Sequence, residues 1–172
     1  SIARRRAEKG SYTLRREDLQ AAALDECLAL WIPRAPSAAS SLQDGAWLAE
    51  RFPARLWIAV ELHADGDDRE RLARLEALGE ALDVPRVAAG DVHMHVRSRR
   101  ALQDTVTAIR LGTTVAEAGD ALFPNGERHL RPLETLQRLY PSRLLRESAR
   151  IAGRCRFSLD ELRYEYPEEL VP

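Results

Sequence analysis

Three short apolar segments separated by helix-forming segments constrain the fold of this chain more than any other feature. The apolar segments span residues 27–32, 56–62 and 86–89, and the helix-forming segments between them span residues 42–51 and 67–82. Short apolar runs that end near proline or glycine are typical of buried strands, and the continuous run 56–62 indicates a strand covered on both faces. Strands that alternate with helices predict parallel strands joined by helical crossovers, which is an α/β fold.

The rest of the chain predicts helices and loops, with no strand in residues 98–154. Further helices are expected at residues 1–9, 14–22, 100–111, 132–140 and 142–154. Capping or first-turn positions are expected at Thr13, Asp67, Ser98, Pro132 and Ser142. We expect loops at residues 35–41 and 123–126, one further helical turn at 113–119, and an extended acidic segment at 157–172.

The net charge of −1 excludes a strongly basic nucleic-acid-binding protein. The charge is nevertheless uneven: residues 40–96 carry −5, residues 97–156 carry +6 and residues 157–172 carry −4. The basic part could face phosphates or an acidic partner surface, and the simpler alternative is a set of solvated helix faces. The arginines considered for a phosphate-facing surface are Arg97, Arg99, Arg100, Arg110, Arg128 and Arg131.

Several function classes lack their sequence signal. The chain has no Gly-x-Ser-x-Gly motif, no phosphate-binding glycine loop and no dinucleotide-binding glycine pattern. Its longest uncharged run, residues 35–43, is too short to cross a bilayer, and no signal peptide is expected. Cys27 and Cys155 match no zinc-binding spacing and fit a reducing cytoplasm. Because the chain begins at Ser1 and its one methionine is Met94, we expect a piece of a longer product.

The main candidate site is Asp91-x-His93-x-His95, which follows the third predicted strand at the carboxyl edge of the sheet. On an extended segment these three side chains point to the same side. One carboxylate and two imidazoles suit zinc, manganese or iron, although other segments would have to complete the site. The alternative is a polar loop in which Asp91 accepts backbone N–H groups and the histidines are solvated.

The other histidines and acidic residues give weaker signals. His63 also follows a strand, and a second ligand cluster with Asp65, Asp67 and Asp68 is conceivable, but a helix N-terminus at a wet surface explains these acids more simply. His129 is isolated in the sequence, which favours a surface position. The acids of the last segment are not interpreted as a catalytic pair: Glu165, Glu168 and Glu169.

Several longer strings resemble one protein family. They are LWIAVELH at residues 56–63, AAGDVHMHVRSRR at 88–100 with LQDT at 102–105, LFPNGERHLR at 122–131, and FSLDELRYEYP at 157–167. Together they resemble the error-prone branch of the bacterial DNA polymerase III alpha-subunit (C) family, over almost the whole chain. The resemblance implies the later part of a polymerase-and-histidinol-phosphatase (PHP) domain, a distorted β/α barrel, followed by an all-helical segment.

The resemblance also implies a division of the chain and a set of site residues. Residues 1–97 would be the partial PHP domain, 98–156 a helical segment, and 157–172 a linker toward the polymerase palm. Asp91 and His93 match the family's last pair of metal ligands, for zinc or manganese, whereas His63 and His95 lie outside that pattern. The remaining ligands and the magnesium-binding polymerase site would lie outside this chain, so no catalytic residue is expected within it.

The function implied by the resemblance is that of a fragment of an error-prone DNA-directed DNA polymerase, which acts in translesion synthesis and damage-induced mutagenesis. Its partners would be DNA, deoxynucleotides, the rest of the polymerase chain, and accessory proteins of mutagenesis and replication. The polymerase would act in the cytoplasm, and no association with a membrane is expected. Two alternatives remain open. The segment could be a metal-dependent phosphoesterase or 3′–5′ exonuclease, or it could be a purely structural interaction module.

Overall fold

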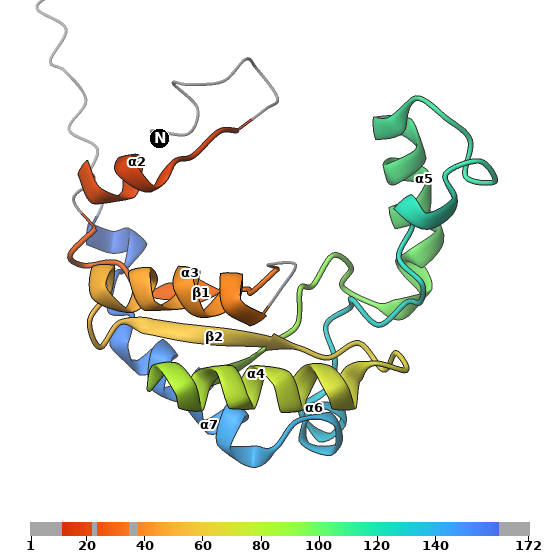
Figure 1. The fold of residues 1–172 in the computed structure, drawn as a ribbon. Helices are drawn as coiled ribbons and strands as arrows, with labels where there is room; N and C mark the ends of the chain where they lie inside the picture. Colours follow the sequence, from red (N-terminus) through yellow and green to blue (C-terminus); the bar gives the residue numbers. More distant parts are fainter. Residues whose placement is uncertain (1–11, 22–23, 35–37, 162–172) are drawn as a thin grey trace, which may run out of the picture.

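The computed structural model describes residues 12–21, 24–34 and 38–161, and its centre is a parallel three-stranded sheet (Figure 1). The strands lie in the order β1–β2–β3, so that consecutive strands are neighbours. Their bounds are Ala29–Trp31 for β1, Leu56–Glu61 for β2 and Arg86–Ala89 for β3. The predicted α/β fold with parallel strands is therefore confirmed, and each strand lies within its predicted segment.

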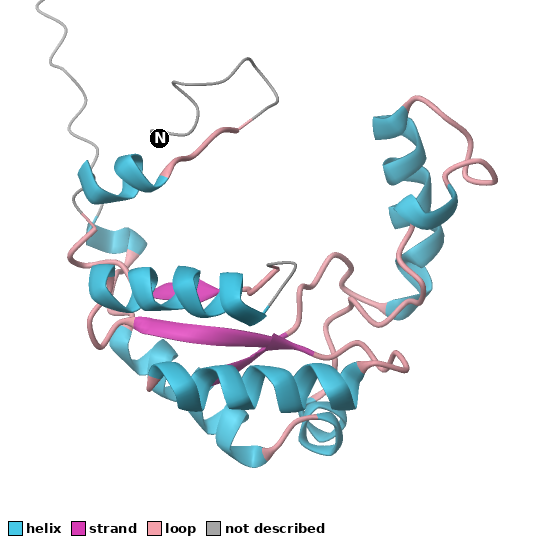
Figure 2. Cartoon of the chain, viewed as in Figure 1, coloured by secondary structure: helices cyan, strands magenta, loops and turns pink. Residues whose placement is uncertain are grey.

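Helices make up most of the remaining structure (Figure 2). The α-helices are α2 Arg16–Ala21, α3 Ala38–Arg51, α4 Asp68–Leu82, α5 Arg100–Leu111, α6 Leu133–Leu139 and α7 Ser142–Arg154. Three short 3₁₀-helices are η1 Arg97–Arg99, η2 Gly119–Ala121 and η3 Leu159–Glu161. The longest α-helix, α4, has 15 residues. No helix among the described residues has the length and apolar character to cross a membrane.

The sheet is covered on both faces, which explains the continuous apolar run of β2. Helices α3 and α4 connect successive strands and pack against each other on one face, and α7 packs beside β3 on the other (Figure 1). Ile58 and Val60 are therefore completely buried. Apolar residues of α6, of α7 and of the turn between them join the same core, including Tyr140 in the turn and Leu144 in α7, which are 3% and 2% exposed.

Two glycines allow the helices to approach the sheet closely. An added Cβ at Gly45 of α3 would lie 2.3 Å from Leu82 Cδ1 and 2.7 Å from the ring of Trp31. An added Cβ at Gly79 of α4 would lie 2.2 Å from Arg86 Cδ and 2.8 Å from a backbone oxygen. All four distances are shorter than van der Waals contact, so no larger side chain fits without a shift of the neighbouring groups.

Strands β2 and β3 separate at their carboxyl ends, and a tyrosine hydroxyl takes the position between them. The Leu62 N–H donates to the Tyr140 hydroxyl at 2.9 Å, and this hydroxyl donates to the Ala89 carbonyl at 2.7 Å. Arg131 Nη1 donates to the Leu62 carbonyl at 2.9 Å. Residues that follow the sheet by many positions therefore complete the hydrogen bonding of its edge.

Residues 97–122, here called the arm, stand apart from the sheet and its helices (Figure 1). The arm contains η1, α5 and η2. Residues 123–131, here called the return segment, bring the chain back and pair with the outgoing chain at the base of the arm. The amides of His93 and Met94 lie 2.9 and 3.0 Å from the Arg128 carbonyl, and the Leu130 N–H donates to the Met94 carbonyl at 3.0 Å.

Most errors in the predicted elements concern helix starts. Residues 38–41, predicted as loop, are the first turn of α3, because alanine and serine fit a helix wherever packing supports it. Asp67 holds the N-cap position of α4, but its side chain makes no capping bond. The Asp68 carboxylate instead accepts the N–H groups of His63 and Ala64. The predicted helix start at residue 14 is also wrong, since α2 begins at Arg16.

The other predicted caps shift by one or two positions. Ser98 lies inside η1, Pro132 precedes the first residue of α6, and Ser142 is itself the first residue of α7. Residues 115–117 form a turn in place of the expected helical turn over 113–119. Residues 98–154, which the structure describes throughout, contain no strand, as predicted, apart from an isolated bridge between His129 and Met94. The predicted helix 1–9 and residues 162–172 lie outside the described residues, and residues 159–161 form η3.

Candidate functional site

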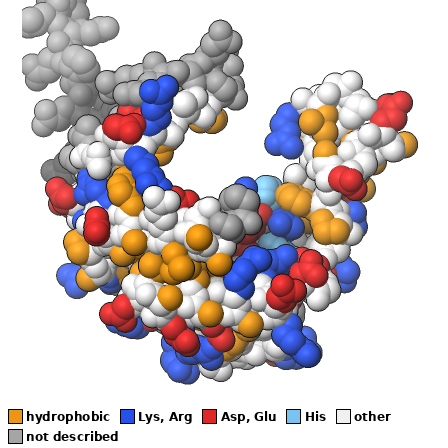
Figure 3. Space-filling model, viewed as in Figure 1, with side chains coloured by type: hydrophobic (Ala, Val, Ile, Leu, Met, Phe, Trp, Pro, Cys, Tyr) orange, Lys and Arg blue, Asp and Glu red, His pale blue; other side chains and the backbone are white. Residues whose placement is uncertain are grey.

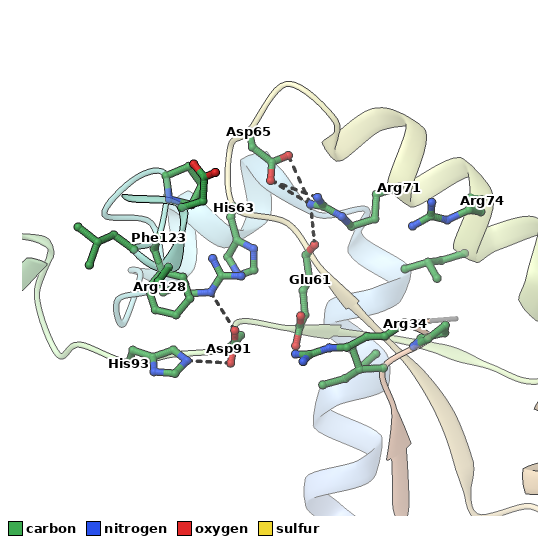
Figure 4. Close-up of a pocket in the computed structure, with 18 residues that line it drawn as sticks. Arg34, Glu61, His63, Asp65, Arg71, Arg74, Asp91, His93, Phe123 and Arg128 are labelled. Carbon is green, nitrogen blue, oxygen red and sulfur yellow. Dashed lines mark hydrogen bonds and ion pairs between the residues drawn. The ribbon is translucent and has the colours of Figure 1, made fainter. Parts of the chain in front are cut away.

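A cavity of about 710 Å³ lies at the carboxyl edge of the sheet, between the strand ends, α4 and the return segment (Figure 4). Figure 3 shows histidine and arginine side chains in the hollow beside the arm. The cavity carries ionisable side chains of both signs. Those labelled in Figure 4 are Arg34, Glu61, His63, Asp65, Arg71, Arg74, Asp91, His93 and Arg128.

Asp91 is bound through both of its carboxylate oxygens. Oδ1 lies 3.1 Å from His93 Nε2, and Oδ2 accepts a bond of 2.8 Å from Arg128 Nε. Asp91 has a φ of 42°, a left-handed conformation that aspartate tolerates better than most residues. The chain therefore bends immediately after β3, and the regular alternation of an extended strand does not continue through residue 91.

Arg128 is held on its other side by an aromatic ring. Its guanidinium lies 4.1 Å from the centre of the Phe123 ring, and the ring of His93 lies 4.9 Å from the same ring. Burial alone would raise the pKa of Asp91, but the bond from Arg128 and the attraction of His93 outweigh burial and lower it. The Asp91 carboxylate is therefore ionised and is the centre of an ion-pair cluster.

His63 is a buried residue of the cavity wall, with 3% of its surface exposed. Its Nε2 lies 3.2 Å from the Gly90 carbonyl, and its own carbonyl accepts a bond of 2.8 Å from Asn125 Nδ2 in the return segment. Burial lowers the pKa of His63, and the positive charge of Arg128 lowers it further. A neutral imidazole that donates to Gly90 is therefore the stable form in the folded chain.

Glu61 is a cavity residue that the sequence analysis did not select. It is the last residue of β2, and its side chain points into the cavity beside Arg34 (Figure 4). Burial raises its pKa, and the nearby negative charge of Asp91 raises it further. The signal that could have identified Glu61 is a charged residue at the carboxyl end of an otherwise apolar strand.

The structure separates the three residues of the main candidate motif. Asp91 and His93 are in contact and line the large cavity, whereas the exposed His95 does not line it. His95 lines a second cavity of about 410 Å³ next to α5, and His93 lies in the wall of both cavities. The second candidate cluster is instead a set of ion pairs, because Asp65 and Asp68 both bind Arg71, at 3.2 and 2.9 Å. Their position at a helix start agrees with the simpler interpretation of these acids.

Two of the basic residues considered for phosphate binding are internal. Arg131 is 9% exposed and bonded to Leu62, and Arg128 is bound to Asp91, so neither lies on a free surface. Arg97 pairs with Glu127 and Arg100 with Asp104. His129, expected at the surface, is half-buried with Nδ1 2.9 Å from the Gly126 carbonyl.

The remaining candidates lie at the surface or outside the described residues. Cys27 and Cys155 are free and exposed. The acidic residues Glu165, Glu168 and Glu169 lie outside the described residues.

The described residues do not form a metal site by themselves. Residues 12–21, 24–34 and 38–161 contain no group of three or more His, Cys, Asp or Glu side chains with the geometry to hold a metal ion. Asp91 and His93 have suitable donor atoms, but the Arg128 guanidinium already neutralises the carboxylate. A metal at this position would need further ligands from outside these residues and would compete with Arg128.

The comparisons with known proteins agree with one another. The chain is 60% identical to the error-prone DNA polymerase of Dechloromonas aromatica, 62% identical to that of Methylococcus capsulatus and 60% identical to that of Pseudomonas savastanoi pv. phaseolicola. Each alignment covers the whole of this chain. The chain spans only 16% to 17% of the length of these relatives. No protein-family model matches the chain.

Proposed function

We propose that this chain is a segment of an error-prone DNA polymerase that copies damaged templates. The observation that supports the proposal is an identity of about 60% to polymerases of that name over the whole length of this chain. The whole protein would act on DNA and deoxynucleotides with magnesium in its polymerase site. It would work with accessory proteins of mutagenesis and replication in the cytoplasm.

The segment would supply part of a PHP domain and no polymerase site. A doubly covered parallel sheet with ionisable residues at its carboxyl edge suits this assignment, because α/β sheets and barrels place their sites at that edge. Among the described residues β1 has β2 as its only strand neighbour. In the barrel that we propose, strands from the longer chain would continue the sheet beyond β1.

Activity of the full-length protein tests the proposal. The polymerase that contains this segment should extend a primer past an abasic site in the template, and the 172-residue chain alone should not extend any primer. A replicative polymerase that stops at the abasic site is the control. Full-length protein that adds no nucleotide to any primer, or that also stops at the lesion, would contradict the proposal.

A metal role for Asp91 and His93 is a finer part of the proposal. In the full-length protein these two residues would be ligands of a zinc or manganese ion that residues outside this chain help to hold. Bound metal would be measured by elemental analysis of wild-type protein and of the Asp91→Asn, His93→Ala and Arg128→Gln variants. The first two changes should lower the metal content, and Arg128→Gln should raise the affinity because it removes the competing cation. Equal metal content in wild type and in the Asp91 and His93 variants would exclude this pair.

A further inference from the structure

One face of α5 exposes a stripe of large aliphatic side chains. Leu102, Val106 and Ile109 are 55%, 53% and 72% exposed. They follow one another at intervals of four and three residues, so they lie on one side of the helix. The opposite side is already packed, since Thr107 and Ala108 are buried. The face of α5 that carries Thr107 and Ala108 is therefore packed, and the face that carries the aliphatic stripe is exposed to solvent.

The stripe forms one wall of a groove. The cavity of about 410 Å³ beside α5 is lined by Leu102, Gln103 and Val106 on the helix and by His93, Met94 and His95 on the outgoing chain, with Arg99 at the start of the helix. Figure 3 shows hydrophobic side chains along the arm on the side in view. A helix of 12 residues gains most of its stability from packing of its apolar side, so a bare stripe beside a groove indicates a surface that another element covers.

The ends of the stripe are basic. Arg99 precedes the helix and Arg110 lies in its last turn, and both side chains are exposed. Neither forms an ion pair with another described residue, whereas the one acid of α5, Asp104, is bound to Arg100. A covering surface would therefore have an apolar centre and carboxylates at its rim.

We infer that this stripe docks against an apolar, carboxylate-rimmed surface elsewhere in the same polymerase chain. The inference rests on the proposed function. Relatives about 60% identical carry this segment within chains about six times as long, so most of such a polymerase lies outside the part described here. Docking would fix the arm, which among the described residues joins the sheet through its base and the return segment (Figure 1).

Photo-cross-linking in the full-length polymerase tests the inference. A benzophenone amino acid would replace Ile109, and cross-linked peptides would be mapped by mass spectrometry. The expected product is an intramolecular cross-link from residue 109 to a peptide outside the 172 residues. The same probe at Ala101, exposed on the same helix but off the stripe, should give at least tenfold less of that product. Absence of a cross-link, or a cross-link between two copies of the chain, would overturn the assignment.

A second measurement covers the case in which the probe disturbs the interface. Amide hydrogen exchange in residues 100–111 of the full-length polymerase should be at least tenfold faster in a Leu102→Gln/Ile109→Gln variant than in wild type. Ala101→Gln should leave the exchange unchanged. Equal exchange in wild type and in the double variant would show an uncovered stripe. Primer extension by the wild type, measured in parallel, separates failure of the docking inference from failure of the proposed function.

Discussion

At the scale of single residues, the Tyr140 hydroxyl stands where the next backbone bond between β2 and β3 would form. A Tyr140→Phe change keeps the ring but leaves the Leu62 N–H and the Ala89 carbonyl without this partner. We expect the free energy of unfolding in urea to fall by about 1–3 kcal/mol, the cost of unpaired buried polar groups. Tyr12→Phe is the control, because Tyr12 is 66% exposed and its change should have no measurable effect. Equal stability of both variants would contradict this role of Tyr140.

His63 gives a pH-dependent contribution to stability. Burial and the charges of Arg128 and Arg131 lower its pKa, and the Gly90 carbonyl and Asp91 oppose them. The unfolded chain therefore binds a proton more readily, so stability is full above a pH of about 6.5 and falls as the pH drops through that value. His63→Gln should flatten this dependence in urea unfolding between about pH 5 and 7. The exposed His95, changed to Gln, should leave the dependence as in wild type; an unchanged slope in His63→Gln would exclude the prediction.

Local spacing predicted part of the candidate site, and contacts between distant residues formed the rest. Asp91 and His93 are two positions apart after a strand, so their proximity could be predicted, although through an extended segment that the bend at Asp91 replaces. Arg128 reaches Asp91 across 37 positions, and Tyr140 reaches Leu62 across 78. No periodicity in the sequence encodes such a contact, because it depends on where the return segment lies.

At the scale of the elements, the close packing of α3 depends on Gly45. A Gly45→Ala change places a methyl group against Leu82 and the ring of Trp31, and should cost about 1–3 kcal/mol in the free energy of unfolding. Gly153 is the matched control, because it also lies in a helix but has no neighbouring atom within 4 Å of an added Cβ. Gly153→Ala should stabilise the chain by about 0.5–1 kcal/mol. The reverse order of the two stabilities in urea unfolding would contradict the packing argument.

The type of each central element could be predicted from the sequence, and so could the first residues of β2 and β3, whereas the start of α3 could not. The apolar run of β2 and the proline and glycine near β3 indicated buried strands, because burial and backbone restriction act locally. The starts of α2 and α3 were wrong because helix propensity is weak beside tertiary packing, whereas the bounds of α5 were predicted correctly. Beside α4 the Asp68 carboxylate accepts the N–H groups of His63 and Ala64, which precede the helix, and it also binds Arg71.

At the scale of the whole molecule, α7 belongs to the same core as the sheet. Leu144 is 2% exposed among residues of β2 and α4, so Leu144→Ala should lower the free energy of unfolding by about 2–5 kcal/mol. The tryptophan fluorescence, to which Trp31, Trp47 and Trp57 contribute, and the helical circular dichroism signal should shift together in urea. Leu159→Ala, at a position that is 76% exposed, is the control. Loss of helical signal at a lower urea concentration than the change in tryptophan fluorescence would contradict a single core, because helical structure would then unfold before the sheet.

The Tyr140 contact also sets the order in which the chain can fold during synthesis. Strand β2 ends at residue 61, but Tyr140, whose hydroxyl accepts the Leu62 N–H, is synthesised 78 residues after Leu62. At about 5–20 residues per second, the ribosome needs roughly 4–16 s to supply it. During that interval the open edge of the nascent sheet is exposed to other chains and to chaperones. In each round of synthesis there is therefore a period when the carboxyl edge of β2 has been made but the tyrosine that closes it has not.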